Sequence, residues 1–114
     1  MNKGVEIELF KKQINDLNKK YQHTAIICKN DDELMIAQQE LASLNLTILD
    51  ETNLSYGNVQ NSILTVQTAK GLEFDSVIIY NHSSYSDNNP NDLKLLYVAK
   101  TRALHKLIIN GYND

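Results

Sequence analysis

The segment ILTVQTAKGLEFDSVIIY, residues 63–80, decides the fold. With the preceding Ser62 it comprises two apolar, β-branched runs, Ser62–Val66 and Ser76–Tyr80, joined by a short polar connection with one glycine. Each run is continuously apolar instead of alternating, which is typical of strands buried on both faces of a parallel sheet. The segment therefore predicts two inner strands of an α/β domain.

Helical and strand patterns alternate along the rest of the chain. Helical spacing of apolar residues predicts helices over Val5–Tyr21, Leu34–Leu44 and Leu93–Leu104, and Asn30 with Glu33 forms a capping signature before the second. Further strands are expected at Thr24–Lys29, Leu46–Leu49 and Lys106–Asn110, with loops at Asp50–Asn61 and Asn81–Asn91. This alternation predicts one α/β domain over residues 1–114, with a leading helix within residues 1–22 and a mostly parallel sheet covered by helices on both faces.

Composition excludes several function classes. The net charge of −3 argues against an unaided grip on nucleic acid, because such affinity comes mostly from many lysine and arginine contacts to phosphates. Cys28 is the single cysteine and the three histidines are scattered, so we expect no disulfide and no metal site. No apolar run is long enough for a membrane span, and the first ten residues lack the apolar core of a signal peptide. A cytoplasmic location is expected.

The connection between the two central strands contains three candidate site residues. Gly71 would let the backbone turn tightly or approach a ligand, Lys70 offers a point charge for phosphate, and Glu73 could accept from a hydroxyl group. Each also has a purely structural interpretation, as a turn glycine, a solvated charge and a helix-capping acid. The residues alone leave both interpretations open.

Arg102 is the only arginine, against ten lysines. It lies near the end of the third predicted helix, which is apolar nearly all round and is therefore expected to be buried. A guanidinium offers a rigid, bidentate fork that suits phosphate oxygens. The alternative is a cation that satisfies the helix dipole and a neighbouring carboxylate.

Both segments resemble a known family. TVQTAKGLEFDSVII is similar to motif V of UvrD/Rep-type superfamily 1 helicases, and LLYVAKTRALHKLII, residues 95–109, is similar to their motif VI. The opening TAIICKNDDELMIAQQEL is similar in layout to the first strand and helix of the same domain. The resemblance implies the second RecA-like domain of such a motor, of the P-loop NTPase type. It lacks its own P-loop, because the sequence contains no GxxxxGK[ST].

The resemblance also implies roles for individual residues. Arg102 would be the catalytic arginine finger, and Gly71 and Glu73 would approach ATP, which with its magnesium ion is bound mainly by a first RecA-like domain. Many relatives have a further arginine in the first strand–helix unit, for which Lys29 is the nearest substitute. Nucleic-acid binding or coupling would fall to Thr65, Gln67 and Lys70, and Thr101 would help to position Arg102.

These roles predict a C-terminal motor domain of an ATP-dependent DNA helicase or translocase that is inactive alone. Its expected partners are the first RecA-like domain and DNA or RNA. Two features point to an alternative, an ATPase domain that remodels RNA polymerase: the lever-like insertion of true helicases is missing, and SVIIYN precedes only a short loop. Gln67 also stands where many relatives have histidine, which puts the coupling role of that position in doubt.

Two non-enzymatic alternatives compete with this interpretation. Asp31 and Asp32 after the first strand suggest a receiver-type signalling module, but such a module needs an aspartate at the end of the third strand, where this chain has Gln67. A binding module that keeps the motor fold only as a docking surface stays open.

Overall fold

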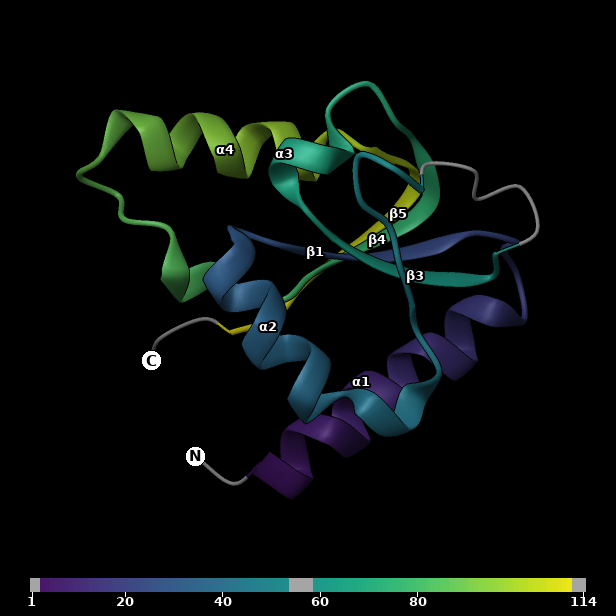
Figure 1. The fold of residues 1–114 in the computed structure, drawn as a ribbon. Helices are drawn as coiled ribbons and strands as arrows, with labels where there is room; N and C mark the ends of the chain where they lie inside the picture. Colours follow the sequence, from purple (N-terminus) through teal and green to yellow (C-terminus); the bar gives the residue numbers. More distant parts are fainter. Residues whose placement is uncertain (1–2, 54–58, 112–114) are drawn as a thin grey trace.

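The computed structural model describes residues 3–53 and 59–111, with side chains from Ile7 onward. Helices and strands alternate along the chain, as the sequence predicts (Figure 1). The elements are α1 (Lys3–Asn18), β1 (Thr24–Cys28), α2 (Asp31–Glu40), the 3-10 turn η1 (Ala42–Leu44), β2 (Thr47–Ile48), β3 (Asn61–Thr65), α3 (Val66–Ala69), β4 (Phe74–Ile79), the 3-10 turn η2 (His82–Ser84), α4 (Pro90–Lys100) and β5 (Ala103–Ile109).

The five strands form one sheet in the order β2-β3-β1-β4-β5. Every pair of neighbours is parallel, and in the central strand Ile26 lies level with Ile63 on one side and Ile78 on the other. All strands therefore begin at one edge of the sheet, here called the amino edge, and end at the opposite, carboxyl edge. The predicted α/β class, with a parallel sheet, is confirmed.

Helices cover both faces of this sheet (Figure 1). On one face α1 and α2 pack against alternate strand residues, including Ile26 and Cys28 of β1. On the other face α3 and α4 pack against the remaining strand residues, including Ala25 and Ile27. Successive residues of β1 thus enter opposite cores, which explains why its sequence is an unbroken apolar run.

The start of α2 follows the predicted capping pattern with one change. The Asn30 side chain accepts a hydrogen bond from the Glu33 amide at 2.9 Å. The Glu33 carboxylate reaches one residue further back than in the usual box and accepts from the Lys29 amide at 2.8 Å. The turn between β1 and α2 is therefore closed from both sides.

The last helix differs from the prediction in its bounds and its burial. It ends at Lys100 instead of Leu104, because residues from Ala103 onward pair with β4 and a strand cannot also be helical. It is not buried all round: Leu96 and Ala99 face the core, but Leu93 is 45% and Tyr97 70% exposed. Arg102 consequently lies just beyond the helix, in the link to β5.

The two predicted loops have different outcomes. The loop expected at Asp50–Asn61 includes residues 54–58, which lie outside the described residues. The loop expected to be exposed at Asn81–Asn91 is exposed from Ser86 to Asn91, but its first part contains η2 and a tyrosine, Tyr85, that is only 4% exposed. Across residues 3–53 and 59–111, no helix is both long and apolar enough to span a membrane.

Candidate functional site

The connection from β3 to β4 places its predicted site residues at opposite edges of the sheet. Thr65 ends β3 at the carboxyl edge and caps α3, its hydroxyl accepting from the Thr68 amide at 3.3 Å. Gln67 follows in α3 with an exposed side chain. Because β4 begins at the amino edge, Gly71 and Glu73 lie there, both exposed, and Lys70 lies just before them. One short segment therefore links the two edges.

Arg102 lies at the amino edge beside the start of β4. Its carbonyl accepts a hydrogen bond from the Phe74 amide at 2.9 Å. Its guanidinium donates from Nε to the Val98 carbonyl at 3.0 Å and from Nη1 to the Leu72 carbonyl at 3.4 Å. Leu72 lies between Gly71 and Glu73, so the fold brings three of the four predicted nucleotide-contacting residues to the same place.

Thr101 contacts this guanidinium through its side chain. Its hydroxyl accepts from Arg102 Nη2 at 3.0 Å and donates to the Val98 carbonyl at 2.9 Å. The hydroxyl and the two carbonyls that receive the guanidinium are neutral oxygens, so these contacts leave the positive charge uncompensated. Neutral hydrogen bonds hold the side chain in direction while its charge can still attract an anion.

Gly71 has a backbone conformation that favours glycine. Its φ of +82° lies in the left-handed region, and a Cβ atom built there would meet nothing within 4 Å. The glycine is therefore required by the turn itself and not by close packing within the chain. The open space beside it leaves room for a ligand or a partner domain.

Lys29 lies at the other edge of the sheet, immediately after β1, and is not brought to Arg102. Its Nζ lies 3.0 Å from Asp92 Oδ2, and the two side chains are only 21% and 11% exposed. The same ammonium donates to the Ser84 carbonyl at 2.9 Å. The Lys29 charge is thus paired with a carboxylate of the same domain. This pairing does not support the predicted nucleotide contact.

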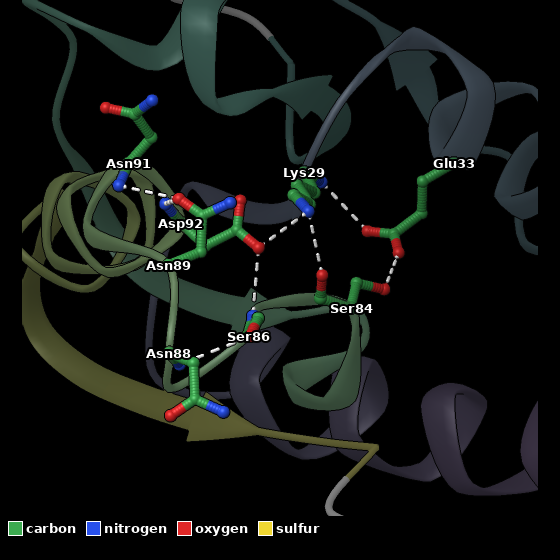
Figure 2. Close-up of polar contacts among 8 residues, drawn as sticks. All are labelled: Lys29, Glu33, Ser84, Ser86, Asn88, Asn89, Asn91 and Asp92. Atoms are coloured by element: carbon green, nitrogen blue, oxygen red, sulfur yellow. Dashed lines mark hydrogen bonds and ion pairs between the residues drawn. The ribbon is translucent and has the colours of Figure 1, made fainter.

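Asp92, which the sequence analysis did not select, is the centre of this second cluster. Its Oδ2 also accepts from the Ser86 amide at 2.9 Å (Figure 2). That hydrogen bond, followed by the one from Lys29, lowers the pKa of the Asp92 carboxyl group, so the ionised form is favoured. The only sequence signal is the Asn89–Pro90 pair just before it, which predicts a helix start but no buried acid.

Two further groups close the cluster. The Glu33 carboxylate accepts from the Lys29 amide and from the Ser84 hydroxyl, joining α2 to η2. The Lys29 ammonium lies 5.8 Å from the centre of the Tyr85 ring. Burial raises the pKa of the Tyr85 phenol, whose oxygen has no hydrogen-bond partner among residues 3–53 and 59–111.

A shallow hollow of about 470 Å³ opens at the amino edge, on the α1 side. It is lined by Lys20, Tyr21, Gln22, Asp75 and His105. The Tyr21 and His105 rings are stacked with their centres 5.8 Å apart, and Asp75 accepts from the Gln22 amide at 3.1 Å. In the part of the chain that the structure describes, no three histidine, cysteine or acidic side chains come together to hold a metal ion.

Comparison with known proteins adds to this geometry. Residues 62–110 match the family model of the UvrD-like helicase C-terminal domain. No curated protein sequence matches the chain. Among solved structures, the C-terminal domain of a possible DNA helicase from Lactobacillus plantarum WCFS1 matches with a TM-score of 0.75 and 26% identity, over 93% of this chain and 66% of that one.

Two more distant structures share the fold. The C-terminal part of the Fun30 ATPase domain matches with a TM-score of 0.56 and 16% identity, over 96% of this chain and 41% of that one. The C-terminal domain of the DEAD-box protein Dbp5 matches with a TM-score of 0.59 and 10% identity, over 95% and 71%. The chain therefore has the fold of a RecA-like helicase C-terminal domain, and its residues 62–110 are similar to the UvrD-like helicase C-terminal domain.

Proposed function

We propose that the chain is the C-terminal motor domain of an ATP-dependent DNA helicase or translocase. In this role it supplies Arg102 as an arginine finger to a nucleotide site that an N-terminal helicase domain completes. The chain alone is inactive, because its sequence has no phosphate-binding loop.

One observation carries this proposal: the arginine is held at an exposed edge by neutral oxygens. The Leu72 and Val98 carbonyls orient the guanidinium without compensating its charge. A structural arginine would gain more from a carboxylate partner, since charge-assisted pairs are the stronger ones. An oriented, uncompensated guanidinium suits the charge that develops on a phosphoryl group during transfer.

The surrounding residues fit a nucleotide that is held mainly by another domain. Gly71 leaves open space beside Arg102, and the exposed Glu73 carboxylate can accept from a hydroxyl group of ATP. Binding of the magnesium ion and of most of the triphosphate falls to the N-terminal helicase domain. This chain supplies the charge that closes the site.

Nucleic acid would lie at the carboxyl edge, where Thr65 and Gln67 are placed. The net charge of −3 means that the chain alone binds it weakly, and that most phosphate contacts come from the partner domain. Lys70 follows α3, on the segment that joins the carboxyl edge to the amino edge. There it can take part in coupling between the nucleic-acid and nucleotide sites. RNA polymerase as a partner and a cytoplasmic location stay predictions from the sequence.

The test is ATP hydrolysis by the ATPase that the chain forms with its N-terminal helicase domain, measured with and without single-stranded DNA. Arg102→Ala is expected to lower kcat by about 10³–10⁵, equivalent to about 4–7 kcal/mol of barrier. Lys106→Ala removes an exposed charge from β5 and is the matched control.

Near-normal hydrolysis by Arg102→Ala would show that the finger assignment is wrong. If the assembled ATPase bound nucleic acid but hydrolysed no ATP even with Arg102 intact, the domain would instead be a non-catalytic binding module.

A further inference from the structure

The cluster around Lys29 and Asp92 has a role that nucleotide contact does not explain. It joins four separate parts of the chain: the end of β1, the start of α2, the η2 loop and the first turn of α4 (Figure 2). Lys29 and Asp92 are 63 residues apart in sequence. Charged side chains are rarely this well buried unless they are paired, so the pair fixes where these parts meet.

Three features define the start of α4: a proline, a side-chain cap and an ion pair. Pro90 occupies its first turn, and the Asn89 side chain accepts from the Asn91 amide at 2.9 Å and from the Asp92 amide at 3.3 Å. The Lys29–Asp92 ion pair then ties this capped end to the central strand of the sheet. The carboxylate also lies in the first turn, where the helix dipole favours negative charge.

The arginine lies just beyond the opposite end of the same helix. From Asp92 to Lys100, its last residue, the helix advances eight residues, about 12 Å at helical rise, with Leu96 and Ala99 buried in between. At the far end Arg102 is held by Val98, a residue of the last turn of α4, and by Leu72. A change in the seating of α4 at Asp92 therefore moves the group that orients the guanidinium.

We propose that Lys29 is a positioning residue: through its ion pair with Asp92 it seats α4 and thereby places the Arg102 guanidinium in the nucleotide site. The inference rests on the proposed function of Arg102. It assigns Lys29 no contact with nucleotide. The position of Arg102 is then set from the carboxyl edge of the sheet. Nucleic acid is proposed to bind at this same edge.

The experiment is a double-mutant cycle in the ATPase formed by the chain and its N-terminal helicase domain. Lys29→Met keeps the aliphatic stem and removes the charge. With Arg102 intact we expect kcat to fall by about 10- to 100-fold while KM for ATP stays nearly unchanged, because small misplacements of a group that acts in the transition state have effects of this size. Lys94→Met, an exposed lysine on the same helix, is the control and should leave kcat unchanged.

The same change is then made in the Arg102→Ala background. There Lys29→Met should have almost no further effect, because residues that act as a unit are not additive. An equal fold-loss in both backgrounds would show that Lys29 does not act through Arg102, and a rise in KM with unchanged kcat would show that it touches the nucleotide directly. Either result overturns the proposal.

A second variant covers the case in which Lys29→Met does not fold. Lys29→Gln combined with Asp92→Asn removes both charges, so no buried charge is left alone. Glutamine is too short to reach both Asp92 and the Ser84 carbonyl as lysine does, so we expect a folded ATPase with the same loss of kcat. A folded double variant with the parent's kcat would contradict the positioning role. If Arg102→Ala alone left kcat unchanged, the proposed function would fail first, whatever Lys29 does.

Discussion

The two edges of the sheet hold a cation in opposite ways. At the carboxyl edge, Lys29 lies 3.0 Å from a carboxylate, in a cluster that ties four parts of the chain together. At the amino edge, Arg102 donates to two carbonyls and a hydroxyl, all neutral, next to a glycine with open space beside it. The first charge is compensated within the domain, whereas these contacts orient the second without compensating it.

Lys29 and Arg102 show how a structural cation can be distinguished from a candidate functional one. Burial alone does not separate them, because both side chains are half-buried. The hydrogen-bond partners separate them. A carboxylate partner neutralises the positive charge, whereas neutral oxygens orient the side chain and leave its charge uncompensated. α4 runs from one edge to the other, and the Lys29–Asp92 ion pair fixes the end at the carboxyl edge. The following changes test each part of this comparison.

The largest expected effect comes from exchanging the type of cation at each edge. Arg102→Lys keeps the charge but loses the planar fork, and we expect ATP hydrolysis by the assembled ATPase to fall by at least about 100-fold. Lys29→Arg keeps a charge that can still pair with Asp92 and should have a much smaller effect. Steady-state kcat of the two variants decides this. Equal effects would erase the distinction between the edges.

The core contact of α4 comes next in size. Leu96 lies between the two ends of the helix and is buried, so Leu96→Ala should lower the free energy of unfolding by about 2–5 kcal/mol. Leu93→Ala, on the exposed side of the same helix, should change it by about 0.5 kcal/mol or less. Urea unfolding of both variants is the measurement. Similar costs would mean that α4 is not seated on the sheet as described.

The turn at the amino edge gives a smaller effect. Gly71→Ala forces an alanine into the left-handed region without a clash, and should cost about 1–2 kcal/mol of stability. Gly111→Ala has nearly the same backbone conformation, but its Cβ would lie 2.8 Å from the Asn81 Cα, so it should cost more. A larger loss of stability for Gly71→Ala than for Gly111→Ala in thermal unfolding would show that the space beside Gly71 is not open.

The smallest expected effect is a dependence on pH at the carboxyl edge. The Ser86 amide and Lys29 hold the pKa of Asp92 below its ordinary value of about 3.9. A carboxyl group whose pKa is lower in the folded state stabilises the fold above the unfolded pKa, and this contribution is lost as the pH falls through the folded pKa. The stability difference between the parent and Asp92→Asn should therefore shrink from about pH 5 downward.

Urea unfolding at a series of pH values measures this difference. Asp87→Asn, an exposed aspartate of the same loop, is the charge-matched control. A gap between the parent and Asp92→Asn that stays constant down to acid pH would show that the ion pair contributes nothing to folding.

The fold could be predicted from the sequence because its signals are local. The inner strands β1, β3 and β4 are mostly apolar runs of fitting length, and the Asn30–Glu33 cap marks the start of α2 within three residues. The strings AKGLEFD and LLYVAKTRA carry the family resemblance without any long-range information. Gly71, Glu73 and Arg102 could therefore be named together before their proximity was known.

The errors concern properties that the tertiary structure decides. Helical pattern continues to Leu104, but pairing of Ala103 with Phe74 begins β5 earlier and leaves Arg102 outside the helix. Tyr97 is apolar in pattern yet 70% exposed. Asp92 has a charge that argues against burial, and its partners offset that cost: the Ser86 amide and Lys29, which the fold brings from 63 residues away. No local spacing contains that pair.

The most direct test of the central claim is a structure of the assembled ATPase with ADP and aluminium fluoride, which imitates the phosphoryl group in transfer. We expect the Arg102 guanidinium to lie within about 3 Å of the fluoride ligands, while Lys29 keeps its ion pair with Asp92. An Arg102 that points away from the fluoride, or a Lys29 that has moved onto the nucleotide, would contradict it.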